Sequence, residues 1–295
     1  MIFPLLTSTL RLSTPLIFAA MGGLLSERAG VINIALEGMM LVGAFGAAVG
    51  TYYTHSPWLG AVIGMGSGML LAAFYGLFVI RWRANQIVAG TGINMLALGI
   101  TPFLCKTFYD VTGSTPAIPL AERFQTAPLW LSWIAVAGCY FLMRSTRPGL
   151  RLSFAGEKPE ALHAAGISVT RVRWRAVLAS GALAGLGGAS LSICLASFFS
   201  RNMTAGRGFI ALAALIFGKW KPIPAALACV LFGLAEAAQI RLQGATVGGV
   251  TIPVQFIQIL PYLLTILVLA GFVGRARMPA ALGVPFETDQ GLRKR

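Results

Sequence analysis

The sequence predicts an all-α protein, a polytopic transmembrane helical bundle, and three observations support this prediction. Of the 295 residues, 57% are hydrophobic and only 11% are charged, whereas about 25% of the residues of an ordinary soluble domain are charged. The mean hydropathy is +0.78, and several apolar runs reach the roughly 20 residues that a membrane-spanning helix needs. Too little polar surface remains to cover a soluble fold, so a soluble enzyme, a DNA-binding protein or a disordered chain is a poor interpretation.

The apolar runs divide the chain into about eight or nine spans. The first two runs contain polar residues: residues 3–25 are interrupted by Arg11, and residues 31–53 carry an Asn and a Glu. Residues 208–218 are too short for a straight crossing, so we expect a half-helix, a re-entrant segment or a buried short helix there. The clear spans are residues 58–80, 86–105, 127–143, 176–199, 222–240 and 253–273.

The charge distribution predicts the orientation in the membrane. The 23 Lys and Arg against 9 Asp and Glu give a net charge of +14. Most of these cations lie in a few short loops and in the C-terminal tail, and the longest such loop, residues 144–175, is rich in arginine. Because Lys and Arg accumulate on the cytoplasmic side of membrane proteins, we place these loops and the C-terminus in the cytoplasm. Nucleic acid is not needed as a partner to explain the charge, and residues 1–295 form a single transmembrane domain.

Many spans contain glycines four residues apart. Gly60, Gly64 and Gly68 form one such series, and Gly181 and Gly185 form another. In lipid, small residues let helix backbones approach closely, because the burial of apolar area no longer drives helix association. The glycines therefore predict a tightly packed helical bundle, although this spacing is compatible with any function.

The sequence contains no catalytic or metal-binding constellation. His55 and His163 lie in predicted loops on opposite sides of the membrane, so they cannot share a metal site or a catalytic triad. The chain also lacks the GxxxxGK[ST] loop that binds nucleotide phosphates, so any ATP must be bound by another chain. We therefore predict that the protein is not an enzyme, has no catalytic or metal-binding residues and binds no cofactor itself.

Polar side chains within apolar spans are costly and are candidates for a substrate pathway. Glu37 is the leading candidate, and Asn33 lies four residues before it on the same helix face. These two residues either line a polar cavity or gate, or Glu37 pairs with a loop arginine such as Arg28 and fixes the helix. The full candidate set is Asn33, Glu37, Asn85, Gln86, Thr91, Asn94, Gln255 and Gln258.

Four members of this set lie at the start of one span. The spacing of Thr91 and Asn94 allows both side chains to face one interior. They offer hydrogen bonds either to a polar, uncharged solute or to neighbouring helices, at about 0.6 kcal/mol for each interhelical bond. Gln255 and Gln258, in the last span, leave the same two alternatives open.

The long basic loop is expected to contain a short helix. Pro159 suits a first helical turn, and Glu157 and Glu160 lie near the positive end of the helix dipole. Residues 160–165 then form the helix, which stops at Gly166, and Ser168 or Thr170 caps the next helix. Such a helix either docks in a groove of a partner protein or lies on anionic lipid, held by the arginines of the loop.

Three segments resemble the permease subunits of ABC importers of the branched-chain amino acid/ribose superfamily. They read SERAGVINIALEGMM at residues 26–40, GEKPEALHAAGI at 156–167 and AGRGFIALAALIFGKW at 205–220, and their order and spacing agree with that family. The sequence FGKWKP at 217–222, followed by LFGLAEAAQIRLQ at 231–243, looks most like the bacterial nucleoside permeases that work with a basic-membrane-protein-type receptor.

The resemblance implies a type II importer-like permease that pairs with a second, homologous permease. ATPase subunits, which hold ATP and Mg²⁺, would bind on the cytoplasmic side, and an extracytoplasmic solute-binding lipoprotein would deliver the solute. The family's loop, here residues 144–175, contacts the ATPase. The residues of this loop to which the resemblance assigns coupling are Gly156, Glu157, Pro159, Glu160, Ala165 and Gly166.

The expected function is therefore ATP-driven import of nucleosides across the bacterial inner membrane, in which the chain lies as a multi-pass protein. A ribose-type, simple-sugar permease is the first alternative, because such permeases share most of the pattern. The second alternative is a proton-coupled secondary transporter with Glu37 or Glu236 as the proton carrier.

Overall fold

The structure is a computed structural model that describes residues 2–243, 246–247, 250–251, 259 and 277–286. Within these residues the regular structure is helical, apart from one antiparallel pair of two-residue strands. The predicted all-α class is therefore confirmed. The expected span 253–273, and with it Gln255 and Gln258, lies outside the described residues apart from residue 259.

The longest connections between the described helices are residues 110–126, which contain one short 3-10 turn, and residues 196–206. Ten α-helices are described: α1 (Ile2–Arg28), α2 (Leu36–Thr54), α3 (Pro57–Gly76), α4 (Gln86–Tyr109), α5 (Ala127–Ser145), α6 (Arg147–Glu157), α7 (Pro159–Ala164), α8 (Val169–Ser190), α9 (Arg207–Phe217) and α10 (Pro222–Leu242). Three short turns of 3-10 or π-helix accompany them: η1 (Leu77–Arg81), η2 (Leu120–Glu122) and η3 (Leu191–Leu195). The strands are β1 (Thr246–Val247) and β2 (Val250–Thr251).

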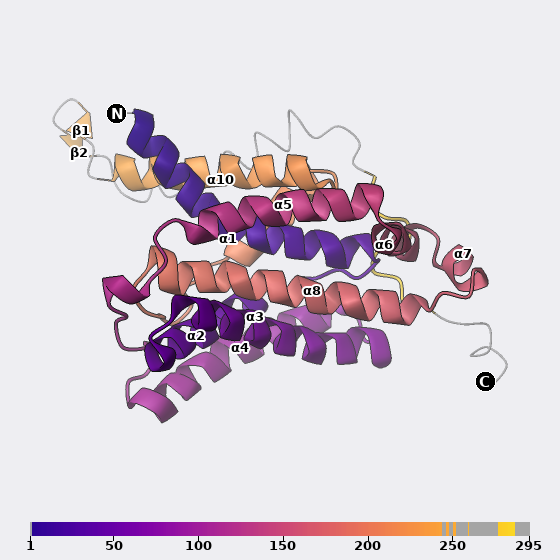
Figure 1. Ribbon diagram of the computed structural model, residues 1–295, viewed down its shortest axis with the longest axis horizontal. Helices are drawn as coiled ribbons and strands as arrows, with labels where there is room; N and C mark the ends of the chain where they lie inside the picture. The colour runs from indigo at the N-terminus through magenta and orange to yellow at the C-terminus, as the bar shows by residue number, and fades with distance from the viewer. Residues whose placement is uncertain (1, 244–245, 248–249, 252–258, 260–276, 287–295) are drawn as a thin grey trace.

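The long helices run along the long axis of the molecule (Figure 1). Six helical stretches of the described chain are long and apolar enough to cross a membrane. Neither α2 nor the short helix α9 is among these six. The predicted total of eight or nine spans is therefore not confirmed. The apolar windows of the spans that contain α1 and α8 are 78% and 72% buried, against 22% for the span that contains α5. The helices α1 and α8 thus form the centre of the bundle, and α5 lies at its periphery.

Helix α2 begins five residues later than the sequence pattern predicted, because the chain leaves the helical path after α1. Gly30 has a φ of +90°, a conformation that favours glycine. The amide of Gly30 donates to Glu27 O at 2.9 Å, and the amide of Val31 donates to Ser26 O at 3.1 Å. These bonds form a Schellman cap. The chain then continues through a non-helical connecting segment, residues 29–35, before α2 starts.

Glycines bring α2, α3 and α8 into close contact, as their spacing predicted. A Cβ placed on Gly64 would lie 2.7 Å from Gly43 O, and one on Gly68 would lie 2.8 Å from the Cα of Gly185. Real Cβ atoms essentially never come within 3.0 Å of such neighbours. The three helices can therefore pack at this distance only because no side chain stands between their backbones.

The basic loop folds largely as predicted. The short helix is α7, which begins at Pro159, and Gly166 lies just beyond its end with a φ of +75°. The hydroxyl of Ser168 accepts the amide of Arg171 at 3.4 Å and caps α8. The helix α6 precedes α7 and was not predicted.

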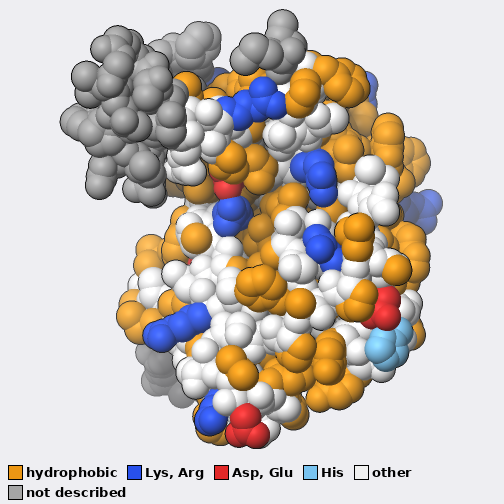
Figure 2. All heavy atoms as spheres, turned by 90° about the vertical axis from the view of Figure 1, so that its left-hand side faces the viewer, with side chains coloured by type: hydrophobic (Ala, Val, Ile, Leu, Met, Phe, Trp, Pro, Cys, Tyr) orange, Lys and Arg blue, Asp and Glu red, His pale blue; other side chains and the backbone are white. Residues whose placement is uncertain are grey.

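The two ends of the bundle differ in how their basic side chains are arranged. Figure 2 shows the end that lies on the left in Figure 1. In the part of this end that the structure describes, basic side chains are dispersed among hydrophobic and polar ones. At the other end, Arg28, Arg144, Lys219, Lys221 and Arg277 line a single cavity.

Candidate functional site

The connecting segment is held inside the bundle by side chains of other helices. Gln86 Oε1 accepts the amide of Ile32 at 2.8 Å. The hydroxyl of Tyr75, from α3, donates to Ile32 O and is itself fully buried. Non-helical backbone within a membrane protein needs such partners, because lipid offers none. Gln86, which the sequence places on a candidate substrate pathway, thus bonds to the protein's own backbone in this structure.

Asn94 fixes the end of the connecting segment to the start of α2. Its Nδ2 donates to Ile34 O at 3.0 Å, and its Oδ1 accepts the amide of Gly38 at 2.8 Å. The Asn94 residue is 6% exposed. Thr91 does not share this environment: it is exposed, and its hydroxyl donates to carbonyl groups of α4 itself. The structure therefore places these two side chains in different surroundings, contrary to the expectation of a common interior.

Asn33 and Asn85 have separate environments. The Nδ2 of Asn33 donates to the hydroxyl of Ser180 on α8 at 2.8 Å, and its Oδ1 is buried with no partner among the described residues. Asn85 is exposed, and its Oδ1 caps α4 by accepting the amides of Ile87 and Val88. Asn33 is thus a buried amide with one free acceptor, whereas Asn85 caps the start of α4.

Glu37 lies at the start of α2 and caps the short helix α9. Its Oε1 accepts the amide of Gly206 at 2.8 Å, and its Oε2 accepts the amide of Gly208 at 2.7 Å. A carboxylate at this position satisfies free N–H groups and interacts favourably with the helix dipole. The suggested pairing of Glu37 with Arg28 is wrong: both oxygens of Glu37 accept backbone amides at the start of α9, and Arg28 pairs with Glu157 at 3.6 Å.

The predicted short segment forms the helix α9, whose first residue is tied to α10. Arg207 forms an ion pair with Glu236, and its guanidinium also donates to Met203 O at 3.1 Å. Glu37 and Glu236, the two candidate proton carriers, thus both hold the same end of α9. This arrangement connects α2, α9 and α10 through two carboxylates.

A large cleft opens between α2, α3 and α4, with a volume of about 660 Å³. Its lining is almost entirely apolar, and its two hydroxyl groups, those of Ser67 and Thr101, donate to carbonyl groups of their own helices. A sugar ring needs several hydrogen-bond partners when it is buried. The cleft as it stands therefore offers a surface for apolar groups rather than for a ribose.

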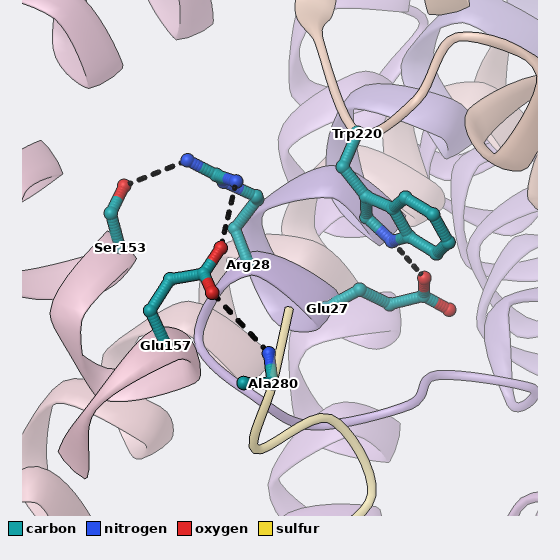
Figure 3. Close-up of polar contacts among 6 residues, drawn as sticks. All are labelled: Glu27, Arg28, Ser153, Glu157, Trp220 and Ala280. Atoms are coloured by element: carbon teal, nitrogen blue, oxygen red, sulfur yellow. Dashed lines mark hydrogen bonds and ion pairs between the residues drawn. The ribbon is translucent and has the colours of Figure 1, made fainter. Parts of the chain in front are cut away.

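The root of the basic loop contacts the connecting segment. A Cβ placed on Gly156, at the end of α6, would lie 3.0 Å from the amide nitrogen of Gly30. Glu157 pairs with Arg28 and accepts the amide of Ala280 at 3.4 Å (Figure 3). Figure 3 also shows Trp220 pointing to Glu27 at the end of α1, with the Nε1 to Oε2 distance at 2.6 Å.

Arg173 is a buried residue of this region that the sequence analysis treated as a loop charge. Its Nε donates to Ala29 O at 3.1 Å, and its Nη1 donates to Val284 O at 2.8 Å. Its Nη2 donates to Ala155 O on α6 at 3.4 Å. The burial of Arg173 could have been predicted from the sequence, because Arg173 lies four residues from both Val169 and Val177 and so shares their apolar helix face.

The helix α7 offers one face to solvent and packs the other against the loop. Pro159 and Leu162 are buried, and Leu162 belongs to a small apolar cluster with Ala155 and Val169. Glu160 is exposed. Among the predicted coupling residues, Gly156 and Pro159 are buried, whereas the others form exposed surface: Glu157, Glu160, Ala165 and Gly166.

Apolar spans, a non-helical segment held inside the bundle and a compact basic loop at one end are the features of a multi-pass membrane protein. The chain belongs to the family described as branched-chain amino acid transport system / permease component, whose model matches residues 5–269. A permease of this family is a transport component and not an enzyme. The resemblance found in the sequence is thereby confirmed, and the family implies an ATPase partner.

Individual relatives are similar over almost the whole chain. The nucleoside ABC transporter permease of Lactococcus lactis subsp. cremoris is 38% identical, with 93% of each chain covered. The guanosine ABC transporter permease of Bacillus subtilis is also 38% identical, with 95% of each chain covered. A putative glucose ABC transporter permease of Haloferax volcanii is 35% identical, over 95% of this chain and 94% of that one.

One solved structure is similar at a lower level. It shows an inward-facing conformation of a putative metal-chelate type ABC transporter, at 15% identity and a TM-score of 0.45, and the match covers 89% of this chain and 84% of that chain.

The environments of Asn94 and Thr91 predict different effects of substitution. We expect Asn94→Ala to lower the stability by about 2–4 kcal/mol, because it leaves Ile34 O and the amide of Gly38 buried without partners. Thr91→Ala should change the stability by less than about 0.5 kcal/mol. Thermal unfolding of the purified proteins measures both effects. Equal stability of the two variants would contradict the structural role of Asn94.

Proposed function

We propose that this chain is a permease subunit of an ATP-driven importer that moves nucleosides across the inner membrane of a bacterium. One observation carries the choice of solute: the relatives named for nucleoside and guanosine transport are each 38% identical over at least 93% of both chains. A sugar is the second candidate, supported by the relative named as a putative glucose permease at 35% identity.

The solute is tested by uptake in cells that contain the complete transporter. We expect unlabelled guanosine, adenosine and uridine to compete with a radiolabelled nucleoside, and glucose and ribose to leave its uptake unchanged. Cells that lack this chain serve as the control. Competition by the sugars alone would replace the nucleoside assignment with the sugar alternative.

The predicted orientation and the family support the following assembly. The basic loop and the C-terminus lie in the cytoplasm, where the ATPase binds the exposed face of α7. A second, homologous permease completes the transmembrane unit, and an extracytoplasmic solute-binding lipoprotein delivers the solute. Since the chain lacks a nucleotide-binding loop, ATP and Mg²⁺ are bound by the ATPase.

A mechanical path supports the coupling role of the loop. Movement of α7 acts on α6, and α6 touches the connecting segment where Gly156 meets Gly30. Arg173 donates hydrogen bonds to both, through Ala155 O on α6 and Ala29 O at the start of the connecting segment. A displacement of the loop would thus reach residues 29–35 and, beyond them, the start of α2. This path links ATP hydrolysis on one side of the membrane to the interior of the bundle.

Glu160→Lys tests the coupling role at an exposed position. We expect at least a tenfold loss of uptake and weaker co-purification of the ATPase, because the charge of the exposed contact surface is reversed. Asp110→Lys is the matched control: its side chain is 98% exposed and lies in a connection that the predicted topology places on the opposite side. Normal uptake by the Glu160 variant would overturn the contact between α7 and the ATPase.

A further inference from the structure

A strongly basic cavity lies at the end of the bundle that the charge distribution assigns to the cytoplasm. Its volume is about 530 Å³, and it opens between the ends of α1 and α5 and the start of α10. Five cationic side chains line it, together with one carboxylate, that of Glu157. The cations are Arg28, Arg144, Lys219, Lys221 and Arg277.

The cations of the cavity are only partly neutralised by the protein. Glu157 lies 3.6 Å from Arg28, and the guanidinium of Arg144 bonds the hydroxyl of Tyr140. Neither Lys219 nor Lys221 lies within ion-pairing distance of a carboxylate among the described residues. The cavity therefore has an uncompensated positive charge, which favours a ligand that carries a negative one.

An unusual turn places the two lysines at this cavity. Lys219 and Trp220 both have positive φ angles, +52° and +54°, which are uncommon for residues with side chains. The turn is held by the indole of Trp220, which is 7% exposed and donates to Glu27 Oε2. Such backbone strain is typically retained where a function needs the geometry. Here the strained turn fixes Lys219 and Lys221, which flank the buried Trp220 in the chain.

The cavity also borders an apolar surface. Ile223 lines the cavity, and Leu227 lies one turn further along α10; both are exposed. Phe141 of α5, next to the cavity residue Tyr140, is exposed as well. A ligand with a negative headgroup and hydrocarbon chains would match both parts of this surface, whereas a soluble anion would match only the first.

We propose that this cavity binds the phosphate headgroup of an anionic phospholipid, with the acyl chains along the exposed side chains of α5 and α10. Basic pockets between transmembrane helices on the cytoplasmic side are suited to such headgroups. The phosphate accepts hydrogen bonds from the ammonium groups of Lys219 and Lys221, and the guanidinium of Arg277 adds a third positive charge. The site lies next to the pair of Arg28 and Glu157, at the root of the coupling loop.

The test is native mass spectrometry of the full chain, purified with the proteins that accompany it, delipidated and titrated with phosphatidylglycerol. We expect Lys219→Gln with Lys221→Gln to weaken the tightest bound lipid about thirtyfold, and Arg277→Gln alone to weaken it about fivefold. The matched control is Arg171→Gln with Arg175→Gln, two exposed arginines at the same end of the molecule outside this cavity. Circular dichroism confirms that each variant is folded.

Unchanged lipid affinity in the control, together with the losses at the cavity, supports the proposal. Equal loss in the control and the lysine variants would mean unspecific attraction and would overturn it. Equal binding of phosphatidylcholine, or displacement of the lipid by an equal concentration of inorganic phosphate, would overturn the lipid assignment. If the lysine variants lose the ATPase but keep the lipid, the cavity is a protein contact and the proposal fails.

Discussion

Glu37→Ala is expected to destabilise the protein severely, because it removes both acceptors at the start of α9. The two hydrogen bonds from Gly206 and Gly208 end on a buried carboxylate that is 6% exposed. Hydrogen bonds to charged groups contribute about 1.5–3 kcal/mol each, so we expect a loss of about 3–6 kcal/mol. For a chain of this size the unfolding midpoint should fall on the order of 10 °C.

Thermal unfolding of the purified protein measures this effect. Glu37→Gln keeps one carbonyl oxygen as an acceptor, so its loss should be intermediate. Glu122→Ala is the control, because this carboxylate pairs with the exposed His55 and such surface pairs contribute at most about 1 kcal/mol. If Glu37→Ala unfolded like the wild type and lost only transport, Glu37 would belong to the substrate pathway and its capping role would be minor.

Gly64→Leu is expected to prevent correct folding of the bundle, because α3 touches α2 and α8 at this residue. A Cβ on Gly64 would lie 2.7 Å from Gly43 O, 2.9 Å from the Cβ of Ala47 and 3.3 Å from the Cβ of Ala189. Backbone atoms cannot yield as the end of a flexible side chain can, so the helices must separate. Overpacking in an ordinary core costs about 1–3 kcal/mol, and we expect more here because three helices must move.

The same helix supplies the control for this experiment. Gly66, two residues away, has no atom within 4 Å of the position of its Cβ. Gly66→Leu adds the same side chain to the same helix, so it should leave the yield and the size-exclusion profile unchanged. The readout is the fraction of each variant that is monodisperse after detergent extraction. Equal behaviour of the two variants would show that α3 does not pack against its neighbours as described.

Local signals in the sequence were sufficient for several parts of the fold. The helix α7 was predicted because Pro159, Gly166 and Ser168 act on the residues next to them in the chain. The end of α1 had a comparable local signal in Gly30, whose place after Arg28 is typical of a helix C-terminus. That signal was outweighed by the apolar run through residues 31–53, so residues 31–35 of the connecting segment were predicted as helix.

The candidate site was predicted less completely, since the sequence identified residues but not their partners. The polar residues Asn33, Glu37, Gln86 and Asn94 are indeed buried. Their hydrogen bonds, however, end on backbone or side chains of distant segments. Thr91 lies three residues before Asn94 in α4 but is exposed. The spacing of residues within one helix does not tell which face of that helix a neighbouring helix covers.

Composition and hydropathy alone determined that the protein lies in a membrane, that it is helical and where most of its spans lie. These properties depend on the transfer of about 20 consecutive residues into lipid, which is a local quantity. Only the tertiary structure decided what the polar residues bind: Glu37 and Gly208 are 171 positions apart in the chain and 2.7 Å apart in the fold. It also assembled the basic cavity, because Arg28, Lys219 and Arg277 approach one another only after the helices pack.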